Sequence, residues 1–232
     1  MKKIAKIYDM LYSYFGPQHW WPVTSPVTLY PEYSDGPKNE KQELEVVFGA
    51  ILTQNTSWKN AEKAIIVLNK EDLFDVDKIN DIDVKKLADL IKSSGYHNQK
   101  ARKLKNFSEY LLENYRGKLH LLFSKNIEEL REELLTISGI GPETADSIIL
   151  YAAKKPVFVI DAYTKRILNR IGYKEETYNE LQTLCMENLP NNEKLFNECH
   201  ALLVELGKGF CRKTPLCNEC PLNKHCNYCK QI

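Results

Sequence analysis

The stretch "ISGIGPETADSII", residues 137–149, decides the fold of this chain. Gly139 and Gly141 flank one isoleucine, and Pro142 follows directly. Two glycines in a turn tolerate positive φ and let another backbone come close, and proline suits the first turn of a helix. The segment predicts a tight turn between two helices, whose free N–H groups can hold a phosphate. An ordinary helix–helix turn is the alternative.

Helical spacing of apolar residues dominates the rest of the chain and predicts about ten helices joined by short loops. Residues 155–160, "KPVFVI", are compatible with one short strand, but no partner strand is evident. Residues 20–40 form the longest irregular piece, with four prolines and several aromatic residues, and are expected to pack as a loop over the core. We therefore expect an all-α fold.

Composition narrows the class of protein. The chain has 232 residues and a formal net charge of +1, so contacts with nucleic acid would come from local basic patches. Neither a signal peptide nor a membrane-spanning run is evident, so we expect a soluble cytoplasmic, nucleoid-associated protein without membrane contact. Five of seven cysteines fall within residues 211–229, a distribution that indicates a metal or cluster site and not a secreted disulfide framework.

The glycine turn belongs to a longer pattern. Residues 159–170, "VIDAYTKRILNR", follow it, and "ILTQNTSWKNAEKA" (51–64) and "SGYHNQKA" (94–101) precede it. Together, and in this order, these pieces resemble the helix-hairpin-helix DNA glycosylases of the endonuclease III superfamily, over roughly residues 41–228. The resemblance implies two helical lobes with a DNA-binding cleft. It places a six-helix lobe at 41–155, ending in the helix-hairpin-helix, and a second lobe at 1–40 plus 156–232.

The resemblance also assigns roles to individual residues. It makes Asp161 the catalytic carboxylate, although an N-cap at the start of a helix is the simpler interpretation. Gln54 would enter the gap left by a flipped base, and Tyr96 or His97 would wedge into the duplex. The turn glycines and Thr144 would contact DNA.

Glu143 departs from part of the family. Members with strand-cleaving lyase activity carry a lysine two residues after the second glycine, where it forms a Schiff base. A carboxylate cannot form an imine, so the sequence predicts base removal without the lyase step. Glu143 could contact the flipped base as a second catalytic group, or it could simply be an acid favoured at a helix N-terminus.

Aromatic residues suggest the substrate. The run Trp20-Trp21-Pro22, together with "LTQNT", resembles 3-methyladenine glycosylases of the endonuclease III type, whose aromatics stack on a methylated purine. A cationic base gains from an aromatic face, and Phe48 could line the same pocket. Ordinary packing of both tryptophans is the alternative.

The C-terminal cysteines suggest a cofactor. Cys211, Cys217, Cys220 and Cys226 are separated by five, two and five residues, and four thiolates in one loop can bind a [4Fe–4S] cluster. The family's loop is similar, usually with six residues in the first gap, and Cys229 offers a substitute ligand. Paired C-x₂-C units could instead hold zinc.

The expected protein is a monomeric, monofunctional glycosylase of base excision repair that acts on double-stranded DNA containing a damaged base. An alkylated purine such as 3-methyladenine is the favoured lesion. A uracil or mismatched-thymine glycosylase, and a non-catalytic helix-hairpin-helix DNA-binding protein, are the alternatives.

Overall fold

A computed structural model describes residues 3–231 and divides them into two compact units. The terminal unit contains the described residues up to Trp20 together with those from Pro156 onward, and the central unit is Trp21–Lys155. The structure therefore corrects the placement of residues 21–40, which the sequence analysis grouped with the N-terminal helix. Thr24 explains the change, because its backbone N and its hydroxyl both donate to Glu45 of the central unit, at 2.8 and 2.9 Å.

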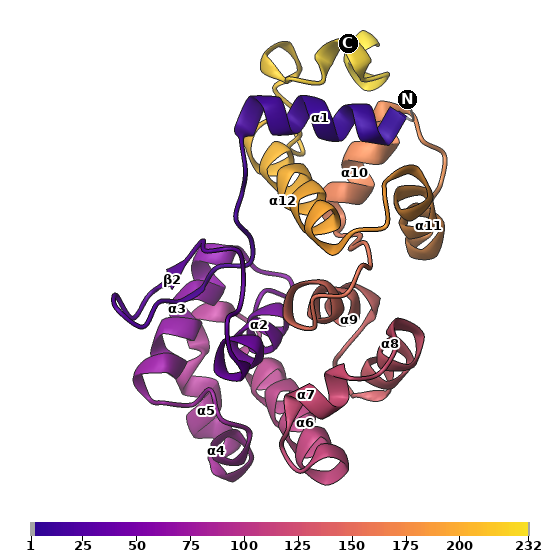
Figure 1. Ribbon diagram of the computed structural model, residues 1–232. Helices are drawn as coiled ribbons and strands as arrows, with labels where there is room; N and C mark the ends of the chain where they lie inside the picture. Colours follow the sequence, from indigo (N-terminus) through magenta and orange to yellow (C-terminus); the bar gives the residue numbers. More distant parts are fainter. Residues whose placement is uncertain (1–2, 232) are drawn as a thin grey trace. The chain divides into compact units, whose positions relative to one another are not determined.

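Helices dominate both units (Figure 1). The terminal unit contains α1 (Lys3–Phe15), α10 (Ala162–Ile171), α11 (Tyr178–Asn188), α12 (Glu193–Gly209) and the short 3₁₀ turns η3 (Cys217–Glu219), η4 (Asn223–His225) and η5 (Tyr228–Lys230). The central unit contains α2 (Glu40–Leu52), α3 (Trp58–Lys70), α4 (Val76–Asp81), α5 (Val84–Leu90), η1 (Lys92–Ser94), α6 (His97–Tyr115), α7 (Leu119–Phe123), α8 (Ile127–Thr136), α9 (Pro142–Ser147) and the π-helical turn η2 (Ile148–Ala152). Among the described residues, no helix is long and apolar enough to cross a bilayer.

The all-α expectation needs one small correction. Two strands, β1 (Val23–Thr24) and β2 (Pro31–Glu32), pair antiparallel within the irregular segment 20–40. Residues 155–160, the strand option from the sequence, form no strand. The pairing depends on the turn at residues 25–30, where Leu29 N donates to Ser25 O at 2.9 Å.

Polar residues at the helix starts explain why the helices begin where they do. Side chains that accept backbone N–H bonds cap α2, α4, α5, α8, α10, α11 and α12; they are Asn39, Asp75, Asp83, Asn126, Asp161, Thr177 and Asn192. Each such cap satisfies donors that the helix leaves unpaired, and its loss typically costs about 1 kcal/mol.

One helix forms the centre of each unit. In the central unit, every residue of α2 from Leu44 to Leu52 is buried, and α3, α6, α7 and η2 pack against it. In the terminal unit, α12 lies between α1 and α10. Gly207 of α12 allows the close approach of α10, since a Cβ there would collide with the side chain of Tyr163. This contact fixes the start of α10, and with it Asp161, relative to α12.

Candidate active site

The glycine turn uses its two glycines differently. Gly139 has a φ of +100°, and a Cβ at this position would collide with the side chain of Lys103. Gly141 is extended, with a φ of −101°, and a Cβ there would meet nothing within 4 Å. The expectation of a special backbone conformation is correct at Gly139 and wrong at Gly141. Only the first glycine is required by the turn itself.

An ion pair anchors the helix that follows the turn. Asp146 of α9 is fully buried, and its carboxylate accepts from Arg131 of α8 at 2.7 and 3.2 Å. Two parallel bonds between guanidinium and carboxylate fix geometry as well as energy. Pro142 occupies the first helical position of α9, and the Glu143 side chain after it is exposed. The Arg131–Asp146 pair therefore anchors α9, while the first residues of this helix are exposed to solvent.

Gln54 lies against this turn. Its Nε2 donates to Gly139 O at 3.1 Å and to the Thr144 hydroxyl at 2.8 Å. Its Oε1 accepts from Lys103 Nζ. The structure therefore brings together Gln54, Gly139 and Thr144, which the sequence analysis grouped only through the family resemblance. Lys103, which the sequence analysis did not select, joins them from α6.

Tyr96 projects from a strained loop. The residue is 65% exposed and has a φ of +47°, an uncommon left-handed conformation for a tyrosine. His97 begins α6 next to it. Lys100 links this loop to the end of α2, because its buried Nζ donates to Ser94 O at 2.7 Å and to Leu52 O at 2.8 Å. Burial lowers the pKa of Lys100 to about 8. Strain of this kind tends to occur at functional sites.

Asp161 caps α10 in the terminal unit. Its Oδ1 accepts from Thr164 N at 2.7 Å, so the N-cap interpretation is correct for this oxygen. Its Oδ2 lies 3.9 Å from His200 Nε2, and the side chain remains 14% exposed. Capping uses one of the two carboxylate oxygens, so the cap does not exclude a second role.

His200 was not selected from the sequence. It lies in α12 and is 4% exposed, with its ring edge-on to Trp20 at 6.1 Å and to Phe158 at 6.5 Å between centroids. Burial lowers the pKa of His200, while the Asp161 carboxylate acts in the opposite direction. The one signal in the sequence is a lone histidine within the apolar run "CHALLVEL" of residues 199–206.

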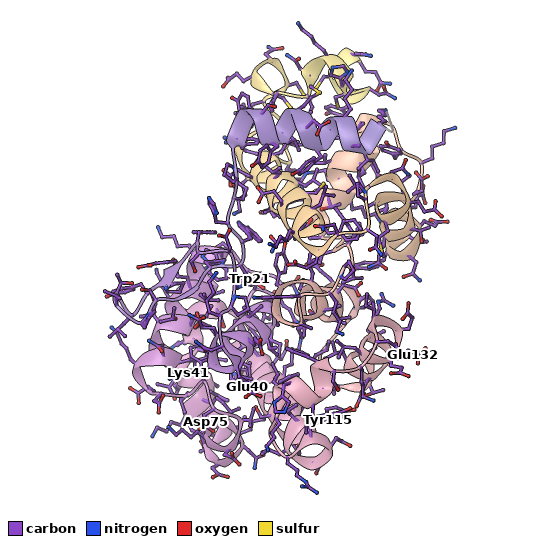
Figure 2. The ribbon with its side chains drawn as sticks, viewed as in Figure 1. Trp21, Glu40, Lys41, Asp75, Tyr115 and Glu132 are labelled. Carbon is purple, nitrogen blue, oxygen red and sulfur yellow. The ribbon has the colours of Figure 1, made fainter. Side chains whose placement is uncertain are left out.

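The proposed base-pocket residues separate in the structure. Trp20 belongs to the terminal unit, is half-buried, and has Lys208 Nζ over its ring at 5.5 Å. Trp21, labelled in Figure 2, belongs to the central unit and is buried. The rings of Trp58 and Tyr151 pack against it.

The other two candidates are also buried in the central unit. Phe48 is fully buried and packs against Phe74 and Phe107, and Pro22 is buried next to Trp21. Ordinary packing accounts for these positions of Trp21, Pro22 and Phe48. Trp20 is the pocket candidate that lies beside His200, the residue next to Asp161.

The five C-terminal cysteines line one pocket. Its thiols are Cys211, Cys217, Cys220, Cys226 and Cys229, and its walls include Ile167, Leu206 and Phe210. Arg170 donates to Cys211 Sγ at 3.2 Å, and burial raises the pKa of Cys220 to about 11. Across the described residues, no three cysteine, histidine or acidic side chains are already arranged as a metal site. The pocket gathers the soft donors of a cluster without presenting them in ligand geometry.

Comparisons with known proteins agree with this arrangement of elements. A model of the HhH-GPD superfamily, described as base excision DNA repair proteins, matches residues 48–191. MJ1434 of Methanocaldococcus jannaschii, which carries the name of a DNA repair glycosylase, is 45% identical over 226 residues, or 96% of this chain and 95% of that protein. Endonuclease III of Thermotoga maritima is 32% identical over 200 residues, covering 83% of this chain and 87% of its own.

A solved structure is also similar. The 3-methyladenine DNA glycosylase MagIII of H. pylori, bound to 1,N6-ethenoadenine, matches with a TM-score of 0.72 and 28% identity, covering 88% of this chain and 97% of MagIII. The family model spans more than half of the chain, and MJ1434 matches it nearly from end to end. The chain therefore belongs to the HhH-GPD superfamily of base excision DNA repair proteins.

Proposed function

We propose that this protein is a monofunctional DNA glycosylase that hydrolyses the N-glycosidic bond of a damaged base in double-stranded DNA. The observation that carries the proposal is Asp161, a partly exposed carboxylate held at the start of α10 by Thr164 N, with a buried imidazole beside it. An enzyme can reach such a base only after the nucleotide is flipped out of the duplex. As the bond to the base breaks, positive charge develops on the sugar, and the carboxylate stabilises it.

Glu143 supports base removal without strand cleavage. The lyase step needs an amine that attacks the sugar and forms a Schiff base. The family resemblance assigns this role to the position that Glu143 occupies, and its exposed side chain ends in a carboxylate. We infer that the reaction stops at the abasic site. The same proposal includes a direct contact between Glu143 and the flipped base, with Glu143 as a second catalytic group.

An alkylated purine is the favoured lesion. Trp20 lies beside His200 and is the one tryptophan of the pair that remains half-exposed, and a cation already lies over its ring in the form of Lys208. The similarity to a 3-methyladenine glycosylase with a bound etheno-purine supports the same class of lesion. A methylated, cationic purine would gain from the face of such a ring.

The substrate test is a panel of duplexes that carry 3-methyladenine, 1,N6-ethenoadenine, uracil, mismatched thymine or 8-oxoguanine. Mild alkali after incubation converts each abasic site into a strand break. Release from the alkylated and etheno duplexes is the expected result, and release from uracil or thymine duplexes alone would replace the substrate assignment. No release from any duplex, with DNA binding intact, would favour the non-catalytic alternative.

The lyase test is borohydride trapping on the substrate that the panel identifies. We expect no covalent protein–DNA adduct from the wild-type protein, while Glu143→Lys provides the amine and serves as a variant in which an adduct can form. A robust adduct from the wild-type protein would overturn the monofunctional assignment.

Four of the five pocket thiols would hold a [4Fe–4S] cluster, with Cys211, Cys217, Cys220 and Cys226 as the primary set. A thiol-only donor set in an apolar pocket fits an iron–sulfur cluster. Its expected contribution here is to the stability of the C-terminal loop. Iron and acid-labile sulfide in equal amounts, with broad absorption near ~400 nm, would support this assignment. A colourless protein with one zinc per chain would contradict it.

A further inference from the structure

The two oxygens of the Asp161 carboxylate have different environments. Oδ1 accepts the Thr164 N–H at 2.7 Å and belongs to the helix cap. Oδ2 is directed toward His200, with 3.9 Å between Oδ2 and Nε2. Because the cap fixes only one oxygen, the rotation of the carboxylate depends on what faces the other.

Aromatic packing holds the His200 ring in place. Trp20 contacts it from the segment after α1, and Phe158 from the segment before α10. The imidazole is therefore fixed by contacts that do not involve Asp161. A rigid partner of this kind can hold a second side chain at a defined angle.

We propose that His200 is a positioning residue, whose Nε2 orients Oδ2 of Asp161 toward the sugar of the flipped nucleotide. This inference rests on the proposed function of Asp161. The distance of 3.9 Å is longer than a hydrogen bond, but catalytic hydrogen bonds are often long before substrate binds and shorten in the complex.

The charge state of His200 suits this role. Burial is the larger influence on its pKa and lowers it, and the carboxylate of Asp161 on α10 is the charge that opposes this shift. Trp20 and Phe158 face the ring with uncharged aromatic groups. A neutral imidazole can donate a hydrogen bond without cancelling the negative charge that the sugar cation requires. A protonated imidazole would form an ion pair with Asp161 and weaken that stabilisation.

The test measures single-turnover base release across pH for the wild-type protein, His200→Gln and His200→Phe. His200→Phe keeps the aromatic packing and removes the donor, so we expect a rate about 10- to 100-fold lower, with affinity for the duplex unchanged. His200→Gln restores an N–H donor, so we expect it to recover most of the rate. Since the amide does not titrate, the fall in rate at acidic pH should shift to lower pH in this variant.

Two controls separate the possible failures. His120→Gln changes an exposed histidine of α7 and should leave the rate and the pH profile unchanged. Wild-type rates and an unchanged acidic limb in both His200 variants would overturn the positioning role, even where Asp161→Asn is inactive. Full activity of Asp161→Asn would instead overturn the proposed function itself. If His200→Phe fails to fold, the pH profile of His200→Gln decides the question.

Discussion

The helices α9 and α10 each have an acid at their start, and the two starts differ in nearly every other respect. α9 begins at Gly141, which has no side-chain cap, and its Glu143 is exposed. α10 begins at Asp161, whose side chain caps the helix and lies close to a buried imidazole. Both acids gain from the helix dipole. Asp161 has Thr164 N on one oxygen and the His200 ring near the other.

A favourable position at a helix start therefore says little about whether an acid is used in catalysis. Solvent weakens the field of an exposed acid such as Glu143. A carboxylate with one oxygen bonded and the other facing a fixed ring loses rotational freedom before substrate arrives, which is the physical meaning of preorganisation.

The largest expected effect concerns the anchor of α9. Arg131→Met removes the guanidinium from the fully buried carboxylate of Asp146. Breaking a buried pair from one side typically destabilises a protein by about 3–5 kcal/mol. Urea unfolding should show this loss, and Arg102→Met, which changes an exposed arginine of α6, should show almost none. Equal stability of the two variants would mean that the pair does not anchor the helix.

The next effect concerns α10. Asp161→Asn keeps a good helix cap and removes the negative charge. We expect base release to fall by about 10²- to 10³-fold, the usual scale for losing one electrostatic stabiliser in an active site, while duplex binding and thermal stability stay close to wild type. If the Asp161→Asn variant is fully active, Asp161 serves only as the N-cap of α10 and not in catalysis.

A third acid, buried within α2, extends the comparison to pH. Burial raises the pKa of Glu45 to about 7, although Thr24 donates two hydrogen bonds to it. Because its pKa is raised in the folded state, the stabilisation linked to protonated Glu45 is fully present below pH ~4.5. This stabilisation is lost as pH rises through about 7. Glu45→Gln keeps the acceptor oxygen and removes the titration. Its stability relative to wild type should therefore increase by about 3 kcal/mol between pH 4.5 and 8. A pH-independent difference in urea unfolding would contradict this assignment.

The smallest effect concerns Glu143. Its side chain is exposed, so Glu143→Gln should change the free energy of unfolding by less than about 1 kcal/mol, the scale of a helix-dipole interaction. Base release then becomes the informative measurement. A large loss of rate at unchanged stability would show that Glu143 acts on the flipped base, whereas a wild-type rate would leave it a helix-start acid.

Local patterns in the sequence predicted the local parts of this fold. Periodic apolar residues predicted the helical character, and the Gly-Ile-Gly-Pro run predicted the turn before α9. The Asp161 cap was also foreseeable, since aspartate at a helix start commonly caps it.

Features that depend on distant segments could not be predicted in the same way. Gln54 meets Gly139 across 85 residues of sequence, and the β1–β2 pair depends on the turn between its strands. Trp20 and Trp21 are neighbours in the chain, yet they belong to different units. No periodicity encodes such a boundary, because it depends on what each ring packs against. His200 was missed for the same reason.

The order of the segments also has a consequence for the ribosome. The central unit is one continuous stretch, so all of its helices are available once Lys155 has left the exit tunnel. The terminal unit is assembled from both ends of the chain, and α1 packs against α12. The apolar face of α1 is formed by Ile4, Ile7 and Leu11. During synthesis, this face therefore stays uncovered until α12 has left the ribosome.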